Sequence, residues 1–421
     1  MNGLERPVGR LGYLLSHYPS ANHTYLLREV RALRGVGVDV VVVSIEHDAR
    51  SDAVLTSAEY EERGRTFAVK RAGAAAFAWG HLATAATRPI RYASGLAAAL
   101  RLAGTDLKRL AYHVAYFGQA VVAGRHLHRA GCGHVHTHYA STVAVIAARV
   151  FRFHVSATIH GSAEFVDPTA QRLREKISAC RFVRAISMYG RSQLMLASPH
   201  TEWPKLSVVR LGVDPDAFTP SARPARVGSF HLATVGQLQP AKGFHVLLDA
   251  MALLIQQCYD VSLTIVGDGA DRTALEAHAA QLDLTARITF TGMLSQPAVI
   301  DVLASADAFV LPSFAEGIPV VLMEAMASGL PCVATRITGI PELIQDDVTG
   351  LLTTPSDVVD LALALGRLVV DEGLRERIAR GGRRRVVEEY NLDRNIADLV
   401  ALFRARLPEF AHLPRNESSV G

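Results

Sequence analysis

The chain alternates short apolar runs with longer stretches in which apolar residues recur every three or four positions. This alternation is typical of α/β proteins built on parallel sheets. In the first half, the runs predict strands at Leu11–Leu15, Val38–Ser44, His134–His136, Val155–Ile159, Phe182–Ile186 and Leu206–Arg210. In the second half, they predict strands at His231–Val235, Leu263–Val266, Ile288–Phe290, Ala308–Leu311 and Cys332–Ala334.

The longer stretches predict helices between these strands. The clearest are Thr24–Leu33, Phe244–Gln257, Arg272–Leu282, Ala298–Ala304 and Pro319–Ser328, with long helices near Leu361–Tyr390 and Arg394–Leu407. Each half then forms a doubly wound, Rossmann-like parallel sheet, and the carboxyl ends of the strands are where such sheets bind ligands. We expect domains at 1–212 and 226–390 that face each other across a cleft. Residues 391–421 are expected to supply a helix that crosses back to the first domain, and a tail.

Composition places the chain among ordinary globular proteins. Its 421 residues suffice for two domains, and 49% are hydrophobic and 20% charged. The four cysteines form no C-x-x-C pair and are expected to be reduced and buried. We expect neither a signal peptide nor a transmembrane helix, and hence a cytoplasmic protein.

The charge is unevenly distributed. Between Gly64 and Ala130, ten basic residues accompany a single acid, Asp106, in a stretch that predicts several helices inserted before the next strand. Aromatic side chains such as Trp79 are interleaved. A basic helical segment of this kind can lie on an anionic membrane, on the inner face of the plasma membrane. It can equally be an insertion that packs on its own domain. No recognition motif points to nucleic acid.

Two glutamates mark the most informative stretch. Glu316 precedes the glycine-containing turn Gly317-Ile318-Pro319, and Glu324 follows within an apolar helix. The N-terminus of that helix offers free N–H groups that suit a phosphate, and the acids suit ligand hydroxyls. Phosphate and hydroxyls together describe a nucleotide sugar. The alternative is a surface turn with solvated glutamates, but a glutamate inside a buried apolar helix needs a partner.

Three other strand ends in the second half carry glycine. The first is Gly236-Gln237, followed by Lys242 at a helix start, where backbone N–H groups and the ammonium can hold a diphosphate. The others carry Gly267 and Gly269, and Gly292 with Met293 after it. Taken singly, each strand end is also consistent with a plain βα turn, and Lys242 with a lysine in solvent at a helix start.

Histidines mark the first half. His160 follows a predicted strand, where it can hydrogen-bond to a reacting sugar or serve the fold alone. His134, His136 and His138 share one strand face. No carboxylate or cysteine lies nearby in the sequence, so we expect no metal site there.

Together these motifs resemble the family 4 glycosyltransferases, which have the two-domain GT-B fold. The resemblance is carried by Gly236, Lys242-Gly243, Val266-Gly267-Asp268-Gly269, Phe290-Thr291-Gly292, Pro312-Ser313 through Glu316-Gly317, Glu324-Ala325-Met326-Ala327 and Gly329-Leu330-Pro331. The opening, with Tyr18-Pro19 and Thr24-Tyr25, is more loosely similar to colanic-acid-type exopolysaccharide glycosyltransferases.

The resemblance implies transfer of a sugar from a UDP- or GDP-sugar to a saccharide or lipid-linked acceptor, with retention at the anomeric carbon and without a metal. By position, it implies that Lys242 binds the phosphates, Glu316 the sugar hydroxyls and Glu324 the ribose. The backbone of Gly317 and Ile318, before Pro319, would approach the sugar and phosphate. Residues near Gly269 and Met293 would line the base, and His160 would lie near the reacting sugar.

One departure stands out. Many family members carry arginine where this chain has Gln237, so one cation on the diphosphate is missing. A charged hydrogen bond contributes about 1.5–3 kcal/mol, against about 1 kcal/mol for a neutral one. Because of Gln237, a donor-binding partner subunit without activity stays open as an alternative. A nucleotide-sugar epimerase of the same fold is the other alternative. For a transferase, no convincing carboxylate nucleophile is visible, which favours attack on the face that the diphosphate leaves.

Overall fold

The computed structural model describes residues 10–20, 23–220 and 228–411. Its contacts divide the chain into two units, each with its own core. The N-terminal unit comprises the residues up to Ile186, Gly190–Val209 and the residues from Ile396 onward. The C-terminal unit comprises Arg210–Asn395 together with Ser187–Tyr189. Residues 221–225, which belong to the expected boundary between 212 and 226, lie outside the described residues.

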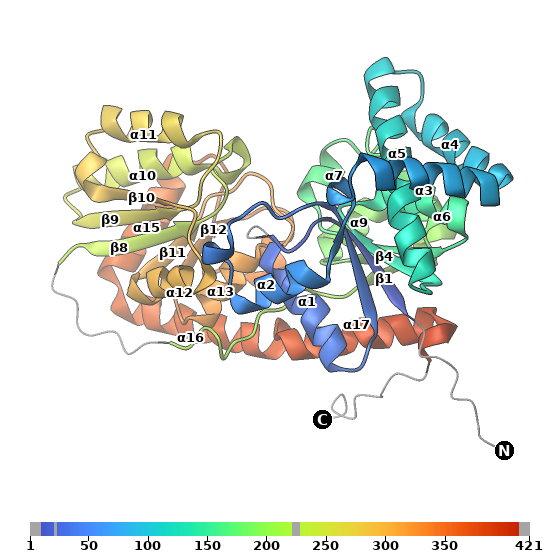
Figure 1. Ribbon diagram of the computed structural model, residues 1–421. Coiled ribbons are helices and arrows are strands. Elements are labelled where there is room, and N and C mark those ends of the chain that lie inside the picture. The colour runs from blue at the N-terminus through green and yellow to red at the C-terminus, as the bar shows by residue number, and fades with distance from the viewer. Residues whose placement is uncertain (1–9, 21–22, 221–227, 412–421) are drawn as a thin grey trace. The chain divides into compact units, whose positions relative to one another are not determined.

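The N-terminal unit is built on a parallel sheet of seven strands in the order β3-β2-β1-β4-β5-β6-β7 (Figure 1). The strands are β1 (Leu11–His17), β2 (Val40–Glu46), β3 (Phe67–Ala68), β4 (His134–His138), β5 (His154–Ile159), β6 (Phe182–Ala185) and β7 (Leu206–Val208). The two-residue edge strand β3 was not predicted, because it is too short to show a pattern.

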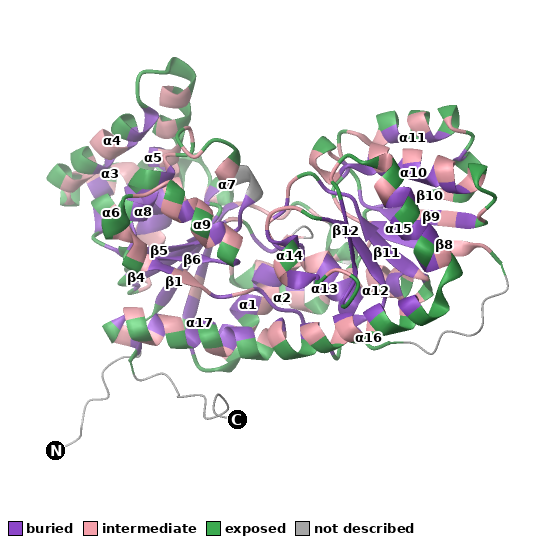
Figure 2. Cartoon of the chain, turned by 180° about the vertical axis from the view of Figure 1, so that it is seen from behind, coloured by how far each residue is buried: buried purple, intermediate pink, exposed green. Residues whose placement is uncertain are grey.

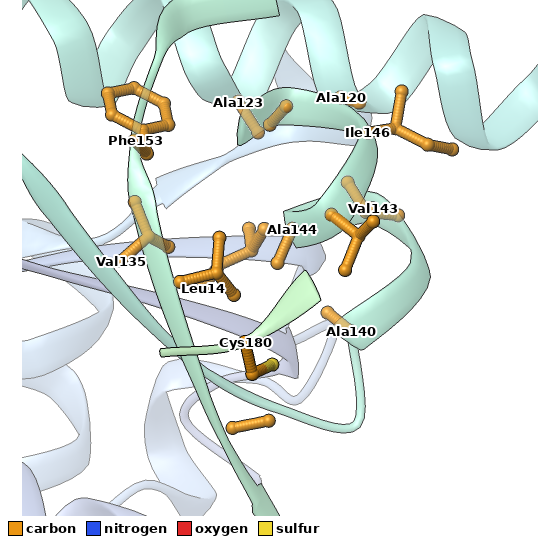
Figure 3. Packing of buried hydrophobic residues seen from close by; sticks show 14 of the residues in the cluster. Leu14, Ala120, Ala123, Val135, Ala140, Val143, Ala144, Ile146, Phe153 and Cys180 are labelled. Atoms are coloured by element: carbon orange, nitrogen blue, oxygen red, sulfur yellow. The ribbon is translucent and has the colours of Figure 1, made fainter. Parts of the chain in front are cut away.

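The helices of this unit connect consecutive strands. They are α1 (Thr24–Gly35), α2 (Ser57–Arg65), α3 (Ala74–Thr87), α4 (Pro89–Ala103), α5 (Leu107–Arg129), α6 (Ser141–Phe151), α7 (Ser162–Val166), α8 (Leu173–Ala179) and α9 (Met188–Leu196). The predicted helical insertion is α3, α4 and α5, of which α5 packs against α6. Figure 3 shows the small side chains Ala120 and Ala123 of α5 and Ala144 of α6 beside Leu14 and Val135 of the sheet. Alanines at these positions let the helices approach the sheet closely.

The C-terminal unit holds a parallel sheet of six strands in the order β10-β9-β8-β11-β12-β13. The strands are β8 (Phe230–Val235), β9 (Val261–Val266), β10 (Ile288–Gly292), β11 (Ala308–Leu311), β12 (Cys332–Thr335) and β13 (Leu351–Thr353). The helices are α10 (Phe244–Gln256), α11 (Arg272–Gln281), α12 (Gln296–Ser305), α13 (Val320–Ala327), α14 (Ile340–Leu343), α15 (Val358–Val370) and α16 (Glu372–Glu389). Figure 2 shows the inner strands β11 and β12 buried, whereas the edge strand β10 is mostly half-buried.

The last helix, α17 (Leu392–Arg406), starts in the C-terminal unit and packs with the N-terminal one from Ile396 onward. Its Phe403 ring lies 5.4 Å from the ring of His136 and 6.0 Å from that of Phe182. The chain therefore returns to its first unit, as expected. The long pattern near Leu361–Tyr390 is two helices, α15 and α16. The side chain of Asp371 caps the second, which begins at Glu372, by accepting a hydrogen bond from the N–H of Leu374.

Two expectations on side chains need correction. Cys132, Cys180 and Cys332 are buried, but Cys258 is exposed, because it lies in the turn after α10 with a φ of +66°. The predicted first helical residue Pro319 is instead the N-cap of α13, in an extended conformation.

Candidate functional site

The order of strands in the C-terminal unit reverses between β8 and β11, which are neighbours in the sheet. Ligands of open α/β sheets bind outside the carboxyl ends of the strands at such a point. The segment after β8 carries Gly236 and Lys242, and the segment after β11 carries Ser313 and Glu316. The candidate residues on the two sides of the reversal therefore share one edge of the sheet.

Lys242 and Glu316 form an ion pair across this reversal. Nζ of Lys242 lies 2.6 Å from Oε1 of Glu316, which also accepts a hydrogen bond of 2.8 Å from the hydroxyl of Ser313. The side chain of Lys242 is 18% exposed and that of Glu316 10%. The pair is thus largely withdrawn from water but open to a small ligand. Two partly desolvated charges of this kind satisfy each other until a ligand replaces one partner.

Glycine is required where the loops approach one another. Gly243, directly after Lys242, has a φ of +65°, and a Cβ there would lie 2.1 Å from the carbonyl oxygen of Pro312. Gly267 has a φ of +136°, and a Cβ there would lie 1.9 Å from the carbonyl oxygen of Gly236. Any side chain would push the loops apart. The glycines predicted to admit a ligand therefore also hold neighbouring loops in contact.

The ends of β8, β9 and β10 are joined by backbone hydrogen bonds. Gly236 donates to Val266 O at 3.0 Å, and Gly267 donates to Gly292 O at 3.0 Å. The N–H of Phe314, after β11, donates to Ala241 O at 2.7 Å. These bonds tie the loop that bears Lys242 to the loop that bears Glu316. The position of the ion pair is therefore set by backbone rather than by the flexible lysine side chain alone.

Glu324 lies in the buried helix α13, as predicted. It is 8% exposed, between Met323 and Ala325, which are fully buried. Ile318 and Pro319 are also buried just before this helix, and Gly317 is partly exposed. Glu316 and Glu324 therefore flank the N-terminus of α13, as the turn between them predicted.

Gln237 and Met293 have exposed side chains at the ends of β8 and β10. Gly269 is partly exposed, and its N–H donates a hydrogen bond of 2.8 Å to Oδ1 of Asp268. These three residues stand where the sequence predicted them, at the edge of the β8, β9 and β10 ends. Their exposure leaves them available to a ligand, but gives no geometry for one.

Three further residues belong to this edge and were not predicted as site residues. Ser313 bonds Glu316, and Thr335 at the end of β12 donates its hydroxyl to Ser313 O. Thr338 has a φ of +47°, which is rare for a β-branched residue, and its buried hydroxyl has no hydrogen-bond partner within the part of the chain that the structure describes. Strained residues gather at functional sites. The sequence gives no sign of that conformation.

His160 belongs to the N-terminal unit, directly after β5 as predicted. It is 8% exposed, and its Nε2 lies 2.8 Å from Nδ1 of His138. Burial lowers the pKa of His160 well below its ordinary value, and the neighbouring His138 and Arg184 add to that effect. The imidazole is therefore neutral at physiological pH.

The other histidines of β4 are bound to hydroxyls. Ser156 Oγ lies 2.7 Å from both Nε2 of His134 and Nδ1 of His136, and Thr158 Oγ1 lies 2.8 Å from Nε2 of His136. Within the described ranges, no three His, Cys, Asp or Glu side chains form a group that could hold a metal ion. The stripe of histidines on β4 is part of the core.

Comparisons with known proteins show what the C-terminal unit is similar to. Residues 220–385 match the family model described as Glycosyl transferases group 1. The C-terminal unit resembles a group 1 glycosyl transferase. The match covers the Lys242–Glu316 pair and Glu324.

Two curated relatives carry related names. The amylovoran biosynthesis glycosyltransferase AmsK of Erwinia amylovora is 36% identical over 193 residues, or 44% of this chain and 47% of the relative. The chain thus spans about half the length of that relative. The putative colanic acid biosynthesis glycosyltransferase WcaL of Escherichia coli is 26% identical over 424 residues, or 93% of this chain and 99% of the relative.

Solved structures show the same fold. HepE from Anabaena, in complex with UDP and glucose, aligns with a TM-score of 0.71 over 94% of this chain and all of its own, at 19% identity. The two parallel-sheet units are those of this glycosyltransferase fold, which confirms the predicted GT-B class.

Proposed function

We propose that this chain is a retaining glycosyltransferase that moves a sugar from a nucleotide diphosphate sugar to an acceptor hydroxyl. The observation that carries the proposal is the Lys242–Glu316 ion pair at the strand reversal of the C-terminal unit. One cation, one acid and a helix N-terminus meet at an edge where such sheets bind nucleotides. The match to the group 1 family model over residues 220–385 supports it.

Each candidate residue has a role in the proposal. Lys242 moves from Glu316 to the diphosphate, and Glu316 is then free to accept hydrogen bonds from the sugar hydroxyls. Glu324 accepts those of the ribose. The backbone around Gly317 and Ile318 approaches the sugar and phosphate, while residues near Gly269 and Met293 line the base. A UDP- or GDP-sugar suits this set.

The chemical demand is the charge on the leaving group. As the bond from sugar to phosphate breaks, negative charge grows on the diphosphate, and Lys242 with oriented N–H groups stabilises it. The proposal needs no metal ion. Gln237 is exposed and uncharged, so Lys242 stabilises more of the charge on the diphosphate than in relatives with an arginine at that position.

The acceptor hydroxyl attacks on the face that the diphosphate leaves, and the departing phosphate oxygen takes the proton of that hydroxyl. His160 hydrogen-bonds to the reacting sugar.

The acceptor is proposed to be a saccharide or lipid-linked saccharide of cell-surface polysaccharide or glycolipid biosynthesis. The names of AmsK and WcaL, which refer to amylovoran and colanic acid biosynthesis, support that class.

The test is a panel of UDP- and GDP-sugars incubated with and without candidate acceptors. A transferase releases nucleoside diphosphate and forms a glycosylated product, and the anomeric configuration of the product equals that of the donor. An epimerase changes the sugar without an acceptor. A donor-binding partner subunit binds the nucleotide but forms no product. Inversion at the anomeric carbon, or a sugar trapped covalently on a side chain, contradicts the proposed chemistry.

An anionic membrane surface is proposed as a further partner. Helix α3 carries no charged residue, yet Trp79 is 62% and Leu82 65% exposed. Exposed cations such as Arg71, Arg101 and Lys108 lie in the same insertion. An apolar face with basic neighbours suits the headgroup region of an anionic bilayer. Among the described residues, no helix has the length and apolar composition to cross a bilayer.

Sedimentation with vesicles tests this partner. A larger fraction of the protein should sediment with anionic vesicles than with neutral vesicles. The double variant Trp79→Ser/Leu82→Ser should lose most of the difference while binding nucleotide normally. Equal binding of the double variant and the wild type to anionic vesicles would exclude this surface.

A further inference from the structure

The N-terminal unit has a strand reversal of its own, between β1 and β4. Helix α1 follows β1 and carries Glu29, β4 ends at His138, and His160 follows the adjacent strand β5. These three side chains therefore meet at the place where a sheet of this kind presents residues to a ligand.

A buried chain of contacts joins them. Nη1 of Arg184 lies 2.6 Å from Oε2 of Glu29, whose other oxygen accepts a 3.0 Å hydrogen bond from Tyr13. Nε2 of His138 lies 3.2 Å from Oε1 of Glu29, off the line of a well-formed hydrogen bond. Nδ1 of His138 in turn lies 2.8 Å from Nε2 of His160. All five side chains are buried.

The charges in this chain are fixed. Burial alone would raise the pKa of Glu29, but the guanidinium of Arg184 outweighs it and holds that pKa well below its ordinary value. Burial lowers the pKa of both His138 and His160. Glu29 is therefore a carboxylate and both imidazoles are neutral, so each carries a single ring proton.

The carboxylate decides where those protons are. A bare Nε2 lone pair on His138 would face the negative oxygen of Glu29 at 3.2 Å, whereas an N–H there is attracted to it. With its proton on Nε2, His138 has only a lone pair on Nδ1. His160 must then donate from Nε2 to His138, which leaves the lone pair of its own Nδ1 as the group that His160 can offer to a hydroxyl.

The ring of His160 is also held in place by two tyrosines. Tyr139 stacks on it with ring centroids 4.5 Å apart, and Tyr25 lies at 5.3 Å. The two tyrosine hydroxyls are 2.5 Å apart. Tyr139 has a φ of +59°, a left-handed conformation that is strained for a residue other than glycine. Strain at the residue that covers His160 is expected where orientation matters more than stability.

We propose that Glu29 and His138 are positioning residues, which hold His160 in the tautomer with its proton on Nε2 and so present Nδ1 as an acceptor to the substrate. The role in transfer rests on the proposed function, whereas the tautomer can be measured without it. Neither Glu29 nor His138 touches the substrate in this scheme. Both act through His160.

The tautomer is tested by long-range proton–nitrogen NMR correlations on protein labelled at histidine, with His160 assigned from the spectrum of His160→Gln. In the wild type, Nε2 of His160 should be protonated and Nδ1 should not. In His138→Leu, which cannot accept the hydrogen bond, His160 should populate both tautomers. His138→Asn, whose amide oxygen can stand near the place of Nδ1, should restore the wild-type pattern. A proton on Nδ1 in the wild type overturns the proposal, whether or not any variant folds.

Kinetics test the role in transfer. His138→Leu should lower kcat about tenfold with the KM for the donor within twofold, and His138→Asn should recover most of the loss. The matched control is His134→Asn on the same strand face, which bonds Ser156 instead of His160 and should leave kcat unchanged. If His138→Leu turns over like the wild type, the positioning role is wrong and the transferase stands. If no nucleotide sugar is turned over by the wild type, the proposed function fails, and the NMR result still decides the tautomer.

Discussion

The two units place charged groups at the same point of their sheets but treat them differently. In the C-terminal unit, Lys242 and Glu316 form a pair that remains partly exposed. In the N-terminal unit, Glu29 and Arg184 form a pair with side chains only 3% and 2% exposed. A pair near solvent can exchange a partner for a ligand. A pair out of reach of solvent cannot, and serves to fix its neighbours.

The largest expected effect is on the buried pair. Glu29→Gln removes the carboxylate that pairs with the buried guanidinium of Arg184 and should lower the free energy of unfolding by about 3–5 kcal/mol, measured by chemical denaturation. The control is Glu61→Gln, which breaks only exposed pairs with Arg31 and Arg65 and should cost less than about 1 kcal/mol. Equal losses in the two variants would erase the distinction between buried and exposed pairs.

The partly exposed pair of Lys242 and Glu316 should matter for activity more than for stability. Lys242→Met removes the cation proposed for the leaving diphosphate and should lower kcat about 10²–10³-fold, measured as release of nucleoside diphosphate in the presence of acceptor. Arg287→Met serves as the control, because it removes a cation of an exposed pair with Asp260 before β10, at the opposite edge of the sheet. Its kcat should equal that of the wild type. Full activity in Lys242→Met would remove Lys242 from the site.

The backbone that holds Lys242 offers a third test. Gly243→Ala combines a φ of +65° with a close approach to Pro312 O, and should cost about 2–3 kcal/mol of stability and weaken the binding of nucleotide. Gly131→Ala is the matched control, since its φ is +83° but nothing lies within 4 Å. The control should cost about 1 kcal/mol and leave binding unchanged. Unchanged nucleotide affinity in Gly243→Ala would show that this loop does not set the site.

The smallest effect is on the pH dependence of stability. Burial lowers the pKa of His134 to about 3, so the folded protein keeps this imidazole neutral while the unfolded chain takes up a proton below about pH 6.5. The contribution of His134 to the free energy of unfolding is present in full above about pH 6.5 and is lost as the pH falls toward the pKa of the folded state. Between pH 7 and pH 5, the free energy of unfolding should fall by about 2 kcal/mol less in His134→Asn than in the wild type. Parallel curves would show that His134 is not buried as neutral imidazole.

The sequence predicted those strands and helices of both units in which apolar residues recur at a regular spacing. The strand Ala308–Leu311 and the helix that bears Glu324 follow from apolar runs that end at Pro312 and near Gly329. The strand Phe182–Ala185 follows from a short, mostly apolar stretch. Helix α6 was missed, although it packs against α5, because it follows β4 without a loop pattern that separates the two. Short β13 gives too few residues for a period.

The sequence predicted which residues belong to the candidate site, but not which of their side chains contact one another. Lys242 and Glu316 were both expected, but their 2.6 Å pairing needs the parallel order of β8 and β11, which no local pattern contains. The same holds for the N-terminal unit. Glu29 and Arg184 are 155 positions apart, and only the fold shows that they are partners. The strained conformations of Tyr139 and Thr338 are likewise invisible in the sequence.

The most direct test of the central claim is a crystal structure of the protein with a nucleoside diphosphate. The account predicts the diphosphate at the ends of β8 and β11, with Nζ of Lys242 released from Glu316 to a phosphate oxygen and the ribose hydroxyls on Glu324. A nucleotide bound elsewhere, with the Lys242–Glu316 pair intact and Glu324 untouched, would contradict it.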